Sequence, residues 1–360
     1  FAFIALASKG YAGHLLMKGE GLKIANLFNG FVFPFAMYFL GKHLIDDERK
    51  LLGFVGILLG LGLYLAATAA AEMIPALHGM VFPRYIMDPD LGIHFGRGRG
   101  PILNAAVNGT IMGMIFMIGL ILVTARGTAP WRRRLAALVL VVLPAGIYFS
   151  QTRACWLGFL VALGVIAKFY PRVRKPLALL AAALVVAVLA RSTLNEREPN
   201  RLAQVSPIHS RMHVYNAAAR MFADHPLLGI GFDNFPHLAP RYFTAIKGIP
   251  YYGDTLVPHD TFFGILTELG LIGFLPLLAV YLALLRTSLR LYRELPAEGV
   301  FGRRFLYFYW AAAVVFVVNM ELIDMRYFVF PNALFFFLSG VMIGVSQRRR
   351  IAATAVREVR

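Results

Sequence analysis

Three side chains that can bind an anion or move a proton stand beside apolar stretches of the sequence: Arg153, Arg211 and His259. An arginine guanidinium presents a planar fork of N–H donors that matches a carboxylate or a phosphate. A neutral imidazole can accept a proton near physiological pH. If the fold brings the three together, these residue types predict a site that holds a polyanion and transfers a proton.

Arg153 stands at the edge of an apolar run that continues through Ala154, Cys155, Trp156 and Leu157. A charge in this position needs a partner or a water-filled cavity, and an anionic ligand would be such a partner. The alternative interpretation is an arginine that reaches lipid headgroups and only anchors its helix. Both interpretations place Arg153 at a membrane boundary.

His259 follows Pro258 and opens a predicted helix that runs on through Asp260 and Thr261. The positive end of a helix favours anions and lowers the pKa of an imidazole. We therefore expect a neutral His259 that can act as a general base. The alternative is a histidine that only caps the helix or packs against it.

Other patterns point to no cofactor and no metal. His209 and His213 have the i, i+4 spacing of a chelating pair, but neither an H-E-x-x-H motif nor a carboxylate-rich cluster accompanies them. We interpret them as solvated histidines. The glycines at 96, 98 and 100 alternate with arginines in what resembles a flexible basic turn, and no strand-turn-helix unit makes them a dinucleotide-binding motif.

The composition predicts that lipid surrounds most of this chain. Its mean hydropathy is +0.66, 59% of the residues are hydrophobic and 15% are charged, values outside the range of soluble domains. The formal charge of +17 lies in short clusters between apolar runs, which favours membrane topology over a nucleic-acid partner. The one cysteine, Cys155, excludes a disulfide framework within the chain.

Apolar runs of about 20 residues predict transmembrane helices. We place nine spans near 23–41, 51–71, 101–124, 135–150, 154–169, 176–192, 260–285, 305–320 and 327–346. Clusters of arginine and lysine occupy every second connection, which assigns those connections and the C-terminus to the cytoplasm. The other connections, 72–100, 151–153, 193–259 and 321–326, then face the opposite side. Because the chain does not begin with methionine, we expect further spans to precede it.

These boundaries divide the chain into spans with short loops over 1–192, a large non-cytoplasmic loop over 193–258, further spans over 259–346 and a cytoplasmic tail over 347–360. The loop from Leu194 to Pro258 holds six basic and five acidic side chains and is rich in aromatic residues and glycine, which is typical of a folded cap rather than a linker. We expect Ser210 to cap a helix that ends at Asp224, before His225-Pro226.

Topology brings Arg153, Arg211 and His259 to one face of the membrane. An arginine that only anchors a helix is expected on the basic, cytoplasmic side, and Arg153 breaks that bias. The predicted position of Arg153 on the non-cytoplasmic side therefore favours the interpretation that it binds an anionic ligand. Within the loop, Tyr215, Arg241 and Tyr242 join Arg153 and Arg211 as candidate substrate-binding residues.

Several short motifs from Thr152 to Phe274 resemble the O-antigen ligase and polymerase superfamily. The segment from Arg211 to Phe235, which includes Asp224-His225-Pro226-Leu227-Leu228-Gly229-Ile230-Gly231, is similar to the family signature. His259 and Gly270 match the H-x10-G spacing of the ligases, and Arg153 and Leu157 match their R-x3-L element. Asp260 stands where many relatives have asparagine.

The resemblance implies a GT-C-type transmembrane bundle with a partly helical periplasmic cap, in the inner membrane of a bacterium. It implies a glycosyltransferase that joins a glycan from undecaprenyl diphosphate to the lipid A core oligosaccharide, without a metal. In that reaction Arg153 and Arg211 would hold the diphosphate, and His259 would be the base for the acceptor hydroxyl.

Three alternatives stay open. O-antigen polymerases carry arginine-led R-x10-G elements, whereas the eleventh residue after Arg211 is Phe222. Protein O-oligosaccharyltransferases tend to carry glutamine in the histidine helix, where this chain has Leu266 and Thr267. A lipid or solute transporter is the third, but we find neither an inverted repeat nor a broken helix at mid-membrane in the sequence.

Overall fold

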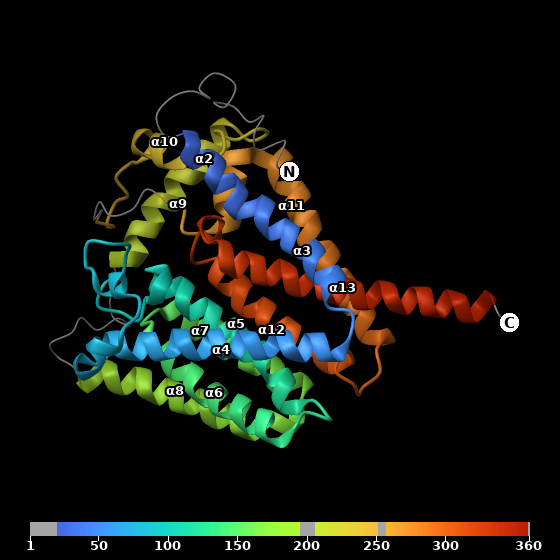
Figure 1. The fold of residues 1–360 in the computed structure, drawn as a ribbon. Coiled ribbons are helices and arrows are strands. Elements are labelled where there is room, and N and C mark those ends of the chain that lie inside the picture. The colour runs from blue at the N-terminus through green and yellow to red at the C-terminus, as the bar shows by residue number, and fades with distance from the viewer. Residues whose placement is uncertain (1–19, 195–205, 251–256, 359–360) are drawn as a thin grey trace. The chain divides into compact units, whose positions relative to one another are not determined.

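The regular structure of residues 20–194, 206–250 and 257–358, which the computed structural model describes, is helical apart from an isolated bridge between Ile246 and Ile249 (Figure 1). The α-helices are α2 (Glu20–Leu27), α3 (Phe33–Leu44), α4 (Glu48–Met73), α5 (Ala105–Thr124), α6 (Pro130–Phe149), α7 (Arg153–Phe169), α8 (Arg174–Leu194), α9 (Ser206–Asp224), α10 (Phe235–Tyr242), α11 (Thr261–Glu294), α12 (Arg303–Met320) and α13 (Val329–Glu358). The short helical turns are η1 (Phe28–Val32), η2 (Pro75–Met80), η3 (Arg84–Met87), η4 (Gly100–Ile102), η5 (Pro171–Val173) and η6 (Met325–Tyr327).

Each of the nine predicted spans overlaps in sequence with a helix of the structure. Within the described residues, six helical stretches are long and apolar enough to cross a membrane: Ile24–Leu44, Glu48–Met73, Ala105–Thr124, Pro171–Ala190, Thr261–Glu294 and Val329–Arg349. The other three predicted spans coincide with α6, α7 and α12, which are not among these six. The chain is an all-α polytopic membrane protein, and the number of nine spans stays a prediction.

The chain divides into two compact units. The first comprises Phe1–Ala36, Ala203–Arg286 and Met320–Ala333, and the second comprises Met37–Leu202, Thr287–Asn319 and Leu334–Arg360. His259 and Arg211 belong to the first unit, whereas Arg153 belongs to the second. The expectation that Arg153 lies beside the other two therefore stays a prediction.

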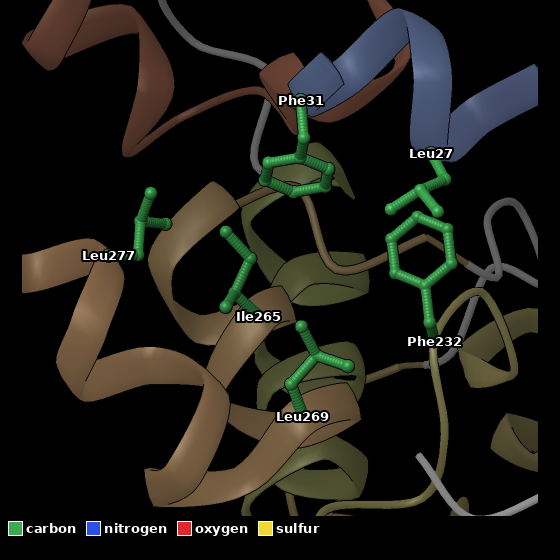
Figure 2. Close-up of a cluster of buried hydrophobic side chains, with 6 residues drawn as sticks. All are labelled: Leu27, Phe31, Phe232, Ile265, Leu269 and Leu277. Carbon is green, nitrogen blue, oxygen red and sulfur yellow. The ribbon is translucent and has the colours of Figure 1, made fainter. Parts of the chain in front are cut away.

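One core of the first unit joins segments that are far apart in the sequence. Leu27 and Phe31 from α2 and η1 pack with Phe232 and with Ile265 and Leu269 of α11, as Figure 2 shows. The ring centroids of Phe31 and Phe232 are 6.0 Å apart in an edge-to-face arrangement. This apolar contact fixes the loop that follows α9 against α11.

A second core of the same unit makes the described part of the 193–258 loop a folded element. Val214, Ala218 and Met221 of α9 pack against Phe235 and Ala239 of α10. Helix α9 ends at Asp224 as predicted, but it already runs from Ser206, so the prediction that Ser210 caps it is wrong. Ser210 is instead buried inside the helix.

In the second unit, α4, α5 and α6 pack against one another. The Asn104 side chain accepts the Ala106 and Val107 amides and so begins α5, all of which is buried from Ala105 to Leu122. A Cβ on Gly146 of α6 would lie 2.8 Å from the Cα of Ala66 on α4. Small residues thus permit the close helix contacts that are typical of membrane bundles.

The glycine-arginine segment that precedes η4 is not the flexible basic turn that we expected. The Arg99 side chain is fully buried, and its guanidinium donates to the carbonyls of Ile86, Asp88 and Leu91. These hydrogen bonds fix the connection between α4 and α5.

Candidate functional site

Helix α11 is broken at Gly270, where φ is +61° and ψ is −166°. The loop after α9 pairs with this break: the Ile230 and Gly231 amides donate to the Thr267 and Glu268 carbonyls, at 3.1 and 2.9 Å. Two amides of α11 donate back to the carbonyls of Pro226 and Leu227. The loop glycines therefore serve a backbone-to-backbone contact that sets the position of α11.

Gly229 shows why this contact needs glycine. Its φ is +65°, and a Cβ there would lie 2.4 Å from the carbonyl carbon and oxygen of Glu268. A real side chain never approaches backbone atoms so closely without displacing one of them. The H-x10-G spacing is thus a structural relationship, with His259 before the helix and Gly270 at its break.

Glu268 is the buried centre of the hydrogen-bond network around this break. Its carboxylate accepts the Asp233 amide at 2.9 Å and the Phe235 amide at 3.2 Å. Nη1 of Arg326 lies 2.5 Å from its Oε2, and both side chains are almost completely buried. Burial of a carboxylate is costly unless it is paired and hydrogen-bonded, and Glu268 is both.

Arg326 joins Glu268 to Asp324. Its Nη2 lies 2.5 Å from Oδ2 of Asp324, and its Nε also donates to the Asp324 carboxylate. A Cβ on Gly264 of α11 would meet Nη2 of Arg326 at 2.7 Å, so the absence of a side chain there makes room for the guanidinium. One arginine thereby holds the connection between α12 and α13 against α11.

The connection between α12 and α13 also contacts Arg211, a predicted site residue, and Thr261 at the start of α11. Nη2 of Arg211 donates to the Leu322 carbonyl at 3.1 Å. The Thr261 hydroxyl donates to the Ile323 carbonyl and accepts the Met325 amide. Residues 321–326, which the sequence marked only as a short connection, therefore position Arg211 and the start of α11.

His259 lies two residues before α11, not in its first turn, and its φ of +53° turns the chain sharply. The Asp260 carboxylate accepts the Phe263 amide at 2.7 Å and satisfies the helix start. Burial, followed by the positive charge of Arg211, lowers the pKa of His259 from 6.5 to about 4, while Asp324 acts in the opposite direction. The expected neutral imidazole is thus present, but burial and Arg211 cause it rather than the helix end.

A carboxyl pair lies beside these residues. The side chains of Asp260 and Glu321 share a hydrogen bond. Burial, then the charge and the hydrogen bond of Asp260, raise the pKa of Glu321 from 4.5 to about 7. Two carboxylates in contact cannot both ionise freely, so Glu321 holds a proton at pH values where an exposed glutamate has lost it.

The candidate substrate-binding residues of the cap lie on two helices, Tyr215 on α9 and Arg241 and Tyr242 on α10. Tyr215 lies close enough to Asp260, Arg211 and Glu321 to interact with their charges. Its ring packs edge-to-face on that of Phe263, with 5.7 Å between the ring centroids. Tyr242, at the end of α10, instead packs on the core of α9 and α10 and shares a hydrogen bond with Asp224.

Arg241 is exposed at the end of α10. Tyr215 is thus the candidate of the cap for which the structure shows an interaction with Arg211 and Asp260.

The interpretation of His213 as a solvated histidine is wrong, because its side chain is buried. Nε2 of the buried His213 lies 3.1 Å from the Ile249 carbonyl and connects α9 to the turn around Ile246. Within residues 20–194, 206–250 and 257–358, no group of three or more His, Cys, Asp or Glu side chains has the arrangement of a metal site.

Four charged residues around the site, to which the sequence motifs assigned no role, are Glu268, Glu321, Asp324 and Arg326. The sequence did contain a signal for Glu268. A carboxylate inside an apolar run is costly to bury, so such a residue is expected to have a charged or hydrogen-bonding partner. The other three lie in or beside a connection of six residues, where only proximity in space reveals them.

The family comparison agrees with the motifs. Residues 138–278 match the family model described as O-antigen ligase. This segment contains Arg153, Arg211, His259 and the α11 break. A comparison with curated proteins gives no match. The match confirms, over residues 138–278, the resemblance to the O-antigen ligase and polymerase superfamily that the sequence predicted.

Proposed function

We propose that this membrane protein is an O-antigen ligase that transfers a glycan from undecaprenyl diphosphate to the lipid A core oligosaccharide. The site would face the periplasm from the inner membrane of a bacterium. The superfamily match supports glycan transfer in general. The H-x10-G spacing from His259 to Gly270 favours the ligases within the superfamily.

The observation that carries the proposal is the position of His259 near Arg211, where partial burial and the arginine charge lower the pKa of the imidazole. Transfer forms a bond between the acceptor hydroxyl oxygen and the anomeric carbon, and it breaks the bond from that carbon to the diphosphate oxygen. The hydroxyl proton must leave as this happens, and a neutral imidazole can accept it. The electron pair of the broken bond stays on the diphosphate.

Arg211 fits the leaving group. Negative charge grows on the diphosphate as the bond breaks, and a guanidinium fixed in advance stabilises that charge without having to reorganise. The hydrogen bond from Nη2 of Arg211 to the Leu322 carbonyl orients the side chain. We propose Arg153 as the second arginine of the donor site, in the place that a divalent metal takes in other transferases.

The depressed pKa of His259 is compatible with this role. A base with a pKa of about 4 is unprotonated at neutral pH but weak. A bound diphosphate brings negative charge close to Arg211. This negative charge offsets the positive charge of Arg211, which lowers the pKa of His259. We propose that donor binding strengthens the base, and that Tyr215, Arg241 and Tyr242 contact the sugars.

The decisive experiment reconstitutes the purified protein in vesicles with an undecaprenyl-diphosphate glycan. Lipid A core, free glycan chain and a pilin-like protein compete as acceptors, with and without a metal chelator. We expect glycan on the lipid A core in both conditions. Glycan on the free chain would make the protein a polymerase, and glycan on the protein would make it a protein ligase. Movement of the donor across the bilayer without any transfer would indicate a transporter.

A further inference from the structure

The connection between α4 and α5 exposes large apolar side chains. Met80 is 74% and Phe82 is 73% exposed, and Ile74 and Tyr85 are also exposed. Helix α4, which is long and apolar enough to cross the membrane, carries exposed apolar side chains of its own at Ile57 and Leu63. The apolar surface therefore continues from the span into residues 74–87, which we call the interfacial segment.

The interfacial segment folds back along α4. The Tyr64 hydroxyl donates to the Phe82 carbonyl at 2.8 Å. Tyr64 lies nine residues before Met73, where α4 ends, which is about 13 Å at the rise of an α-helix. Tyrosine side chains on helices also point toward the N-terminus, away from that end. The Phe82 backbone is thus well below the end of the helix.

The length of α4 sets the depth of this contact. Its 26 residues span about 39 Å, which exceeds a hydrocarbon core of about 30 Å by roughly 9 Å. Even if all of this excess lay at the Met73 end, a group about 13 Å below that end would lie inside the hydrocarbon boundary. A tilted helix extends less far along the membrane normal, so tilt would only reduce the length of α4 that projects beyond the hydrocarbon core.

Backbone groups at this depth must be satisfied within the protein, since no water reaches them. Arg99 does this for the end of the segment: its Nε and Nη2 donate to the Ile86 carbonyl, and other N–H groups donate to the Asp88 and Leu91 carbonyls. The Arg84 guanidinium donates to the His78 carbonyl at 3.2 Å, and because Arg84 is exposed, its long side chain can carry the charge to the lipid headgroups.

The positive charge of Arg99 is stabilised by neighbouring carbonyl groups and by the Glu72 carboxylate. Its side chain is fully buried among these carbonyl dipoles. The Glu72 carboxylate accepts the amides of Arg99 and Gly100, at 3.1 and 2.7 Å, and lies close enough to feel the guanidinium charge. The glycine-arginine motif thereby supplies the donors that a non-α-helical segment needs in an apolar medium.

We infer that residues 74–87 lie in the lipid leaflet at the Met73 end of α4, with Met80 and Phe82 among the acyl chains. The partner of this surface is lipid rather than another protein, because the surface continues the exposed apolar face of a membrane-spanning helix. Asp90, which is exposed on the next turn, stays in water because a carboxylate in hydrocarbon is costly. The inference does not depend on the proposed function.

Spin labels attached to single cysteines test the depth directly. Cys155, the one cysteine of the chain, is replaced by Cys155→Ser, and Met80→Cys, Phe82→Cys, Asp90→Cys and Ile57→Cys are made singly in that background. All four positions are exposed, so the labels disturb little packing. Each labelled protein is reconstituted in vesicles, and the accessibility of the nitroxide to oxygen and to a water-soluble nickel chelate is compared.

We expect the labels at 80 and 82 to show an oxygen-to-nickel accessibility ratio several-fold above that at 90 and similar to that at 57. Labels at 80 and 82 that match the ratio at 90 would place the segment in water and overturn the inference. Labels at 80 and 82 shielded from both reagents would mean that protein covers the segment, which overturns it equally.

Discussion

Arg326 and Glu268 form an ion pair in the interior of the first unit, with 2.5 Å between Nη1 and Oε2 and side-chain exposures of 3% and 0%. Asp324 completes the arrangement on the other side of the guanidinium. Because the Leu322 carbonyl, two residues before Asp324, accepts from Arg211, the position of the ion pair bears on the position of the site arginine.

Arg326→Gln should strongly destabilise the protein. The substitution leaves two buried carboxylates without their cation, and loss of one partner of a buried pair typically costs about 3–5 kcal/mol. The measurement is the thermal unfolding midpoint in detergent. The control is Arg290→Gln, which removes a surface contact of 3.9 Å with Glu294 between half-exposed side chains. Equal midpoints for the two variants would contradict this role of Arg326.

Gly229→Ala should be far more damaging than Gly248→Ala. Both glycines have a positive φ, so both substitutions carry a backbone strain of about 1–2 kcal/mol. Only at Gly229 does the new Cβ also meet backbone atoms, at 2.4 Å, whereas nothing lies within 4 Å of it at Gly248. Glycan transfer should fall only in Gly229→Ala, and the unfolding midpoint should fall slightly in Gly248→Ala but much further in Gly229→Ala. Similar losses in both would mean that the close approach to Glu268 is unimportant.

Arg211→Lys should impair transfer almost as much as Arg211→Ala. Lysine keeps the charge but loses the planar fork that binds a diphosphate in two places. The measurement is the rate of transfer at saturating and at limiting donor. Arg220→Lys is the control, because Arg220 lies exposed on the same helix. A normal rate in Arg211→Lys would reduce the role of Arg211 to that of a point charge.

The stability of the protein should respond to pH in opposite directions through His259 and Glu321. Between pH 6.5 and about 4 the unfolded state binds the His259 proton and the folded state does not, so this residue lowers stability as pH falls. Between pH 4.5 and about 7 the folded state holds the Glu321 proton, so this residue lowers stability as pH rises.

The unfolding midpoints of His259→Asn and Glu321→Gln, measured from pH 4 to 8, separate the two effects. Relative to the wild type, His259→Asn should gain stability as the solution becomes more acidic, by at most about 3 kcal/mol for a shift of that size. Glu321→Gln should gain stability as the solution becomes more basic. Parallel curves for all three proteins would show that neither group has a shifted pKa.

The helices were predictable because each depends on a local property, the length of an apolar run. The end of α9 at Asp224 followed from His225-Pro226 in the same way. The start of α9 was not predictable from Ser210, because the helix already continues from Ser206 and no local rule excluded that. The change of direction at Gly270 also escaped prediction, since only the pairing with residues 226–231 makes it necessary.

The site was predictable in part. Arg211 and His259 stand in recognisable motifs, and the structure places them near each other. Glu268 and Arg326 are 58 residues apart, and Asp260 and Glu321 meet only because α11 and the end of α12 are neighbours. Arg241 and Tyr242, which lie on α10, were selected by residue type within the loop, and their part in the site stays a prediction.

The most direct test of the role of His259 is glycan transfer by His259→Asn in vesicles that contain the undecaprenyl-diphosphate glycan and lipid A core. Asparagine tolerates the φ of +53° at this position, so the backbone is preserved while the base is lost. His237→Asn, at an exposed position of α10, is the matched control. We predict that His259→Asn remains folded and transfers no glycan while His237→Asn transfers at the wild-type rate. Wild-type transfer by His259→Asn would contradict the proposed mechanism.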